Sequence, residues 1–290
     1  MSETAQASFD IEPAPRSVPA STRRRLLYGR PTAQVGWAFL AAGMIFFWVF
    51  GWRCEFWTML QFSRSTAYAH GAVTGVEDTG SSENEERIFR ISYRFDVDGT
   101  SYTGASYGFH NQFAGSEPVS IEYVTGSPSV SRIDGMRREP FSAWAMLVTI
   151  FPGLGLLFAF LGLRAGRRDM RVLVHGRPTL GILREKEPTG TSVNEVPEYQ
   201  LRFSYIDEHG DQRAGDIRTF RPDRVEDEPE ERLLYDPRQT RHIVLIDALP
   251  GKVHLDHRGR LAASGSSAKY MIAPAAAALV CGLFLVLGVF

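Results

Sequence analysis

The sequence contains very little cysteine. Only two of its 290 residues are cysteines, Cys54 and Cys281, and each lies in or beside a long apolar segment, far from the other. A disulfide framework or a thiolate metal site needs more cysteines than this, so neither is predicted. We interpret both side chains as buried thiols, because free cysteine usually behaves as a small hydrophobic residue.

The chain also lacks an excess of charge of either sign. It has 32 Lys and Arg residues against 33 Asp and Glu residues, a formal net charge of −1. No field of the whole molecule therefore favours nucleic acid, and no nucleic-acid partner is predicted. The hydrophobic fraction of 44% is ordinary for a soluble protein, but the apolar residues are concentrated in three runs.

Charge is absent altogether from these runs. Phe141–Leu163 holds no Asp, Glu, Lys, Arg or His, and Val35–Trp52 and Tyr270–Phe290 are similar. A helix of about 20 residues spans the roughly 30 Å hydrocarbon core of a bilayer. We expect three transmembrane helices, within residues 33–66, 141–163 and 269–290, with the lipid bilayer as a partner. The three runs have no charged residue that could form a proton or ion path.

The first membrane segment is expected to continue as an amphipathic helix along the headgroups, because apolar residues recur there at helical spacing. They are Phe56, Met59, Leu60 and Phe62. Pro152 and Pro274 could kink the other two helices, and Gly153, Gly155 and Gly162 could allow another helix to approach closely.

The N-terminal tail, residues 1–31, is rich in Ser, Ala, Pro, Glu and Arg without apolar periodicity, which predicts disorder. Its basic residues bear on orientation. If all three runs cross the membrane, twelve Lys and Arg residues near the spans lie on the side of the N-terminus and five on the other side. The positive-inside rule then predicts a cytoplasmic N-terminus and a multi-pass protein. The twelve are Arg16, Arg23, Arg24, Arg25, Arg30, Arg164, Arg167, Arg168, Arg171, Arg258, Arg260 and Lys269, and the five are Arg53, Arg64, Arg132, Arg137 and Arg138.

Residues 68–135 have the pattern of a small antiparallel β-domain. Arg87–Val97 alternates between apolar and polar residues, and Asp98-Gly99 is a favoured two-residue hairpin turn. The other expected strands are Ala72–Val76, Thr100–Tyr107, Val119–Tyr123 and Val130–Ile133. Five short strands suggest a barrel or sandwich, and the acidic stretch Glu77–Glu86 is expected to be a solvated loop.

Residues 170–258 predict a second β-domain of similar pattern. Its expected strands are Tyr199–Tyr205, Gln212–Phe220, Leu233–Tyr235 and His242–Ile246, with a turn at residues 208–211. The fold class is therefore α+β: three membrane helices and two small antiparallel β-barrel or sandwich domains.

The two β-domains resemble each other, which suggests an internal duplication. His70-Gly71 is aligned with His175-Gly176, and Glu122-Tyr123 is aligned with Leu234-Tyr235. The members of the second pair lie further apart in the chain than those of the first pair. This difference predicts an insertion near Glu187–Pro197.

Five regions carry a resemblance to a known family. They are residues 70–80, 87–99, 119–135, the membrane run 141–163 and residues 234–247. Together they resemble bacterial members of family 3592 of the domains of unknown function. The resemblance implies a β-domain between membrane helices in the bacterial inner membrane. It brings no activity, cofactor or site residue.

One motif could indicate an enzyme. Gly104-Ala105-Ser106-Tyr107-Gly108 matches the Gly-x-Ser-x-Gly pattern of serine hydrolases, and His110 follows closely. That pattern works on a strand–turn–helix within a large α/β sheet, whereas this motif lies in a β-strand of a small domain. A membrane-anchored serine hydrolase that uses Ser106 remains the alternative hypothesis.

Two polar clusters could bind a cation but are better interpreted as solvated segments. His254, Asp256 and His257 lie beside arginines and lack a second ligand cluster, and Pro229 interrupts the carboxylate run Glu226–Glu231. We predict no catalytic, cofactor-binding or metal residue. The sequence favours a non-enzymatic anchored module whose β-domains bind a protein or envelope component, such as another membrane or envelope protein, or help to assemble a membrane complex. A transporter or channel accessory subunit is a further alternative.

Overall fold

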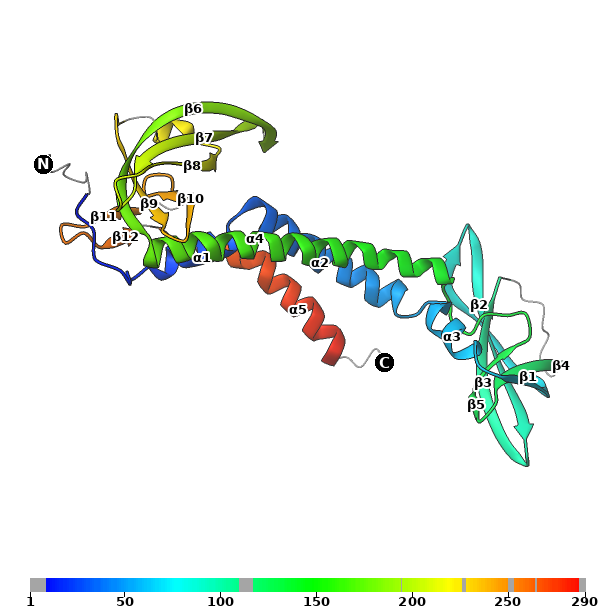
Figure 1. Cartoon of the computed structure of the whole chain (residues 1–290). Helices are drawn as coiled ribbons and strands as arrows, with labels where there is room; N and C mark the ends of the chain where they lie inside the picture. Colours follow the sequence, from blue (N-terminus) through cyan, green and yellow to red (C-terminus); the bar gives the residue numbers. More distant parts are fainter. Residues whose placement is uncertain are drawn as a thin grey trace, which may run out of the picture. The chain divides into compact units, whose positions relative to one another are not determined.

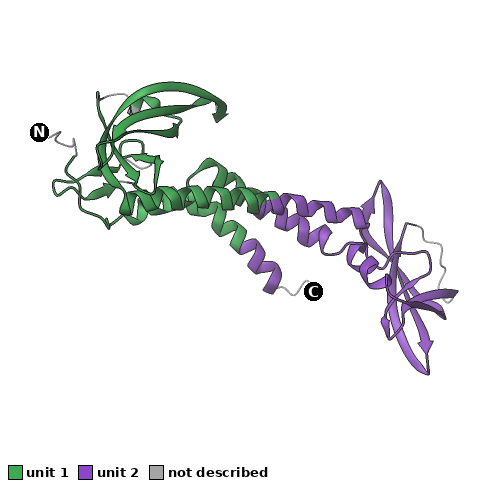
Figure 2. Ribbon diagram, viewed as in Figure 1, with its two compact units in different colours: residues 1–39, 154–278 green, residues 40–153, 279–290 purple. Residues whose placement is uncertain are grey.

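The computed structural model describes residues 9–109, 117–193, 195–225, 228–249, 253–263 and 265–286. The chain forms two compact units, each built from separated stretches of sequence (Figure 2). Unit 1 comprises residues 1–39 and 154–278, and unit 2 comprises residues 40–153 and 279–290.

Within the described residues, three helices are long and apolar enough to cross a membrane by length and composition: Pro31–Gly51, Ala143–His175 and Ala268–Val286. The first consists of α2 (Pro31–Phe46) and the π-helical η1 (Phe47–Gly51), and the second of η2 (Ala143–Thr149) and α4 (Ile150–His175). The third consists of η4 (Ala268–Met271) and α5 (Ile272–Val286) (Figure 1). The prediction of three apolar helices is confirmed at this level.

Some of the glycines that were expected to allow close helix packing do so in the structure. An added Cβ at Gly162 of α4 would lie 2.6 Å from the Cβ of Ala33, and one at Gly36 would lie 2.2 Å from the amide nitrogen of Ala159. Gly153, by contrast, has no atom within 4 Å of that position. Gly162 and Gly36 therefore let α2 and α4 approach closely in unit 1, and Gly153 has no such role.

Unit 2 contains a five-stranded antiparallel sheet in the order β3-β2-β1-β4-β5. Its strands are β1 (Thr66–Glu83), β2 (Glu86–Val97), β3 (Thr100–Gly108), β4 (Pro118–Val124) and β5 (Ser127–Ile133), and α3 (Glu55–Phe62) precedes them. The hydrophobic core of this sheet is formed by apolar residues of the alternating segments: Val73, Ile91, Tyr93, Phe95, Val119, Ile121 and Ile133. Asp98 and Gly99 form the expected turn with positive φ angles.

Residues 77–86 are not a loop, so this expectation is wrong. β1 and β2 continue as a two-stranded ribbon to the pair Glu83–Glu86, and only Asn84 and Glu85 form the turn. The ribbon has a polar sequence because most of its side chains are solvated, and cross-strand contacts such as Arg87–Asp78 (2.7 Å) join its strands.

Unit 1 contains the second five-stranded sheet, which closes into a barrel in the order β10-β8-β7-β6-β9. The strands are β6 (Arg177–Val193), β7 (Val196–Ile206), β8 (Gln212–Thr219), β9 (Glu231–Asp236) and β10 (Gln239–Leu245), with the short η3 (Pro222–Arg224) after β8. A single parallel pairing between His242 and Asp216 closes the barrel. The other pairings are antiparallel, as predicted.

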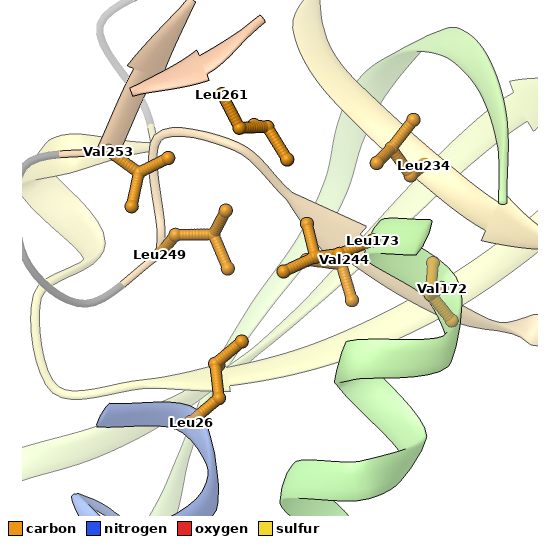
Figure 3. Packing of buried hydrophobic residues seen from close by; sticks show 8 residues of the cluster. All are labelled: Leu26, Val172, Leu173, Leu234, Val244, Leu249, Val253 and Leu261. Carbon is orange, nitrogen blue, oxygen red and sulfur yellow. The ribbon is translucent and has the colours of Figure 1, made fainter. Parts of the chain in front are cut away.

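A hydrophobic cluster of unit 1 lies between the sheet, the helices and a small hairpin of β11 (Val253–Leu255) and β12 (Leu261–Ala263) (Figure 3). It joins Leu26, Val172, Leu173, Leu234, Val244, Leu249, Val253 and Leu261. This cluster attaches the C-terminal end of α4 to the barrel.

The prediction of disorder for residues 1–31 is wrong from residue 9 onward, where the structure describes the chain. Residues 20–28 form α1 (Ala20–Tyr28), and Leu26 is part of the cluster in Figure 3. Phe9, Ile11 and Val18 pack against the same cluster. A few apolar anchors order this segment, although its average composition is polar.

The two sheets have the same register. Gly71 pairs with Phe95 and Gly181 with Tyr205, while Ile121 pairs with Ile133 and Leu233 with Leu245. The offset in residue number between equivalent positions is therefore constant over the first two strands, and it is only slightly larger over the last two. Even the bulge at Val73/Gly75 recurs at Leu183/Glu185.

This register corrects the alignment made from the sequence. The counterpart of Gly71 is Gly181 rather than Gly176, because His175 ends α4 and Gly176 precedes β6. No insertion falls at residues 187–197, since β6 and β7 match β1 and β2 pair by pair. One extra residue lies between β7 and β8, and another between β8 and β9.

Candidate functional site

Ser106, the serine of the Gly-x-Ser-x-Gly pattern, lies inside the core of unit 2. Its side chain is on β3, its exposed fraction is 0%, and its Oγ accepts a hydrogen bond from the amide of Ile133 at 2.8 Å. The hydroxyls of Tyr93 and Ser131 lie 3.0 Å apart beside it, and burial raises the pKa of Tyr93. An added Cβ at Gly104 would lie 2.4 Å from the Tyr93 hydroxyl, so this glycine makes room for the ring.

The second sheet does without these polar groups. By the shared register, Tyr93, Ser106 and Ser131 correspond to Phe203, Ile217 and Ile243. The glycine is retained, because an added Cβ at Gly215 would meet Ile243 at 2.5 Å. The motif is therefore a packing feature of a strand and lacks the strand–turn–helix of a nucleophile elbow. His110 lies outside the described residues.

The two polar clusters also have structural explanations. Asp256 lies in the β11–β12 turn and accepts the amides of Arg258 (2.8 Å) and Arg260 (2.9 Å), which lower its pKa. Of the run Glu226–Glu231, the first two residues lie outside the described part, while Glu231 is buried at the start of β9. In the described part of the chain, no three His, Cys, Asp or Glu side chains are grouped to hold a metal ion.

A large groove of about 1270 Å³ lies in unit 1 at the C-terminal end of α4. Three stretches line it: residues 9–16, residues 171–178 and the β9–β10 turn at residues 236–238. We call it the basic groove, because four arginines and a histidine line it against two aspartates. They are Arg16, Arg171, Arg177, Arg238 and His175, and Asp10 and Asp236.

Arg16 is the fixed cation of the basic groove. It is buried, and it donates through Nη1 to the carbonyl of Gly176 at 2.8 Å and through Nε to that of Glu12 at 2.6 Å. Its amide donates to the carbonyl of Val174 at 2.9 Å. Burial lowers its pKa, but an arginine stays charged at neutral pH. Arg16 thus caps the carbonyl end of α4 and offsets its dipole.

The other cations of the groove point to solvent. Arg171, His175, Arg177 and Arg238 are exposed. Arg177 lies 3.4 Å from Glu208, whereas Arg171 and Arg238 make no ion pair with any residue that the structure describes. Asp236 is buried, and its carboxylate accepts a hydrogen bond from the amide of Arg238 at 2.9 Å, which stabilises the β9–β10 turn.

The first sheet shows that this fold does not require these charges. Arg177 and Arg238 correspond in register to Ala67 and Gly126 of unit 2. In a smaller cavity of unit 2, about 370 Å³, the lining residue Arg90 forms an ion pair with Glu77 at 3.6 Å. Of these two hollows, the basic groove has the larger volume. Two of its cations, Arg171 and Arg238, have no ion-pair partner in the described part of the chain.

Sequence reasoning did not find the basic groove. Its three stretches lie far apart in the sequence, and nothing in the pattern of any one of them shows that they meet. In the sequence, the arginines that follow the uncharged run 141–163 indicate only a membrane orientation.

No protein-family model matches this chain, and no curated protein matches it.

Proposed function

We propose that this chain is a non-enzymatic module, anchored in the bacterial inner membrane by its three apolar helices, which binds another membrane or envelope protein. The observation that carries the proposal is the basic groove, with arginines where the equivalent turn and strand of the other sheet have Ala67 and Gly126. The buried and hydrogen-bonded Ser106 supports the non-enzymatic part.

The partner should be acidic and should approach from the aqueous side. Arg164 is the first charged residue after the uncharged run, and Arg171 and His175 follow it on the same helix. At about 1.5 Å per residue they lie about 10 and 16 Å further along the axis, for a helix near the membrane normal. The headgroup layer is only about 5–8 Å deep on each side. The groove therefore suits an acidic protein segment better than a lipid headgroup.

The shared register and the shared bulge support a duplication of one β-unit as the origin of the two sheets. The family resemblance of the sequence, to membrane proteins with a β-domain between helices, agrees with this architecture. We therefore also propose that the chain is a member of that family of unknown function, a membership that implies no particular activity.

Photo-crosslinking in native membranes tests the proposal. A photoreactive benzoylphenylalanine at Pro237, an exposed residue of the groove, should yield a specific adduct. The same group at Thr125, the equivalent turn residue of unit 2, is the matched control.

The decisive variant replaces two cations by the residues of the other sheet, as Arg177→Ala with Arg238→Gly. Each surface charge pair is worth up to about 1 kcal/mol at about 4 Å in water, so the adduct yield should fall roughly tenfold. An adduct at Pro237 that this variant leaves unchanged, or labelling no stronger than at Thr125, would refute the proposed binding site.

A further inference from the structure

A second surface, on unit 2, is apolar and exposed. The helix α3 (Glu55–Phe62) leaves Trp57 38% exposed and both Met59 and Leu60 55% exposed. The adjacent η2, which contacts α3, adds Trp144 with 78% exposure. Large apolar side chains gathered on one surface usually mark an interaction site.

The opposite face of α3 is fastened to the sheet and the following linker. Glu55 and Thr58 are buried, and the Oε2 of Glu55 accepts the amides of Arg138 and Glu139, each at 3.0 Å. The guanidinium of Arg132 lies 4.3 Å from the ring centre of Phe62. These contacts fix the rotation of α3 about its axis, so its apolar face cannot turn inward. They also correct one expectation, because Phe62 faces the sheet rather than the headgroups.

The position of α3 along the chain places it next to the membrane helices. The first apolar helix ends at Gly51, and α3 begins shortly after it at Glu55. The amide of Glu55 donates to the carbonyl of Phe141 at 2.9 Å, and the rings of Phe50 and Phe141 lie 5.0 Å apart. Phe141 begins the central uncharged run. The start of α3 is therefore held at the level where both helices leave the hydrocarbon core.

We propose that the face of α3 formed by Trp57, Met59 and Leu60 lies in the bilayer interface and binds lipid. Tryptophan and long aliphatic side chains are favoured at the boundary between headgroups and acyl chains. The exposed arginines Arg53 and Arg64, on either side of the helix, can reach headgroup phosphates. This contact would hold the β-unit of unit 2 at the membrane surface. It is independent of the basic groove.

Nitroxide labels on the full chain test this contact. Cys54→Ser and Cys281→Ala give a background without native thiols, and the serine keeps a donor for the carbonyl of Gly51, which Cys54 contacts at 3.0 Å. In this background, a single cysteine for the nitroxide label is introduced at Met59 in one variant and at Leu60 in another. Each labelled protein is reconstituted in vesicles of three parts phosphatidylcholine to one part phosphatidylglycerol. Collision with oxygen, which is enriched in lipid, is compared with collision with a water-soluble nickel chelate.

Two control labels calibrate the measurement. Thr100, the exposed first residue of β3 after the hairpin turn, reports water, and Leu156, an exposed apolar residue of α4, reports hydrocarbon. Labels at Met59 and Leu60 should show an oxygen-to-nickel collision ratio at least threefold above that at Thr100 and below that at Leu156. A ratio equal to that at Thr100 would mean that the face is in water. Low collision with both reagents would mean that protein covers it, and either result overturns the proposal. If the label at Leu156 behaved like water, the membrane anchoring itself would fail.

Discussion

Replacing Ser106 by alanine should weaken unit 2 without removing any activity. Its Oγ is the acceptor for the amide of Ile133, a buried residue at the end of the edge strand β5. Without it that amide is buried and unpaired, a loss of about 1–3 kcal/mol. Tyr93 keeps its hydrogen bond with Ser131 but loses its contact with the Ser106 hydroxyl, so the loss falls mainly on the amide of Ile133 and in part on Tyr93.

The size of the effect can be measured in two ways. For a β-unit of about 70 residues, each kcal/mol lowers the melting temperature by roughly 4–8 °C. Thermal unfolding in detergent, followed by near-ultraviolet circular dichroism of the tyrosines, should therefore shift by at least about 4 °C. Hydrogen exchange of the Ile133 amide should accelerate at least about fivefold, because its protection depends on this bond. Ser101→Ala, on an exposed position of the same strand, is the control and should change little.

Two outcomes would refute the reasoning about Ser106. Covalent labelling of the wild-type protein by a fluorophosphonate that disappears in Ser106→Ala would show a reactive serine, and the non-enzymatic proposal would fail. An unchanged melting temperature with unchanged exchange at Ile133 would show that the hydroxyl does not hold β5.

Three further predictions concern the helices and the turns. Gly162→Leu should clash with Ala33 and cost about 1–3 kcal/mol of stability, whereas Gly153→Leu should be tolerated, as judged by melting in detergent. Glu55→Ala removes the acceptor of two amides and should lower the melting temperature and raise hydrogen exchange around residue 138. The hydrogen bond from Arg213 lowers the pKa of Asp207 below its ordinary value of 3.8, so the stability from this group is present above that pH and is lost as the pH falls through the lowered pKa. In urea unfolding between pH 2 and 6, Asp207→Asn should reduce this loss, and an unaltered pH profile would contradict the assignment.

The central strands β2 and β7 were predictable because each has one buried face. Residues 89–97 and 199–205 alternate between apolar and polar side chains, and in β2 and β7 the apolar ones form the cores. Because successive side chains of a strand point to opposite faces, the alternation shows which residues of the strand face the core. The turn at Asp98-Gly99 followed from the need for positive φ angles.

The failures have a common physical origin. The ribbon at residues 77–86 has no buried face to produce alternation, and the segment from residue 9 is ordered by a few anchors on distant residues. The alignment of His175-Gly176 with His70-Gly71 followed residue identity where only strand pairing could decide. The basic groove depends on three stretches that meet only in the folded unit.

The measurement that tests the account most directly is the membrane topology of its two β-units. The positive-inside rule predicts a cytoplasmic N-terminus, residues 68–135 outside the inner membrane and residues 170–258 inside. Alkaline phosphatase, which is active only outside, should be active when fused at Ser127 and silent when fused at Gly210. A fluorescent protein that matures only inside should give the opposite pattern. The reverse of both patterns would invert the orientation and move the basic groove to the outer side. Phosphatase activity at both sites would show that Phe141–Leu163 does not cross the membrane once, and the account of an anchored module would be contradicted.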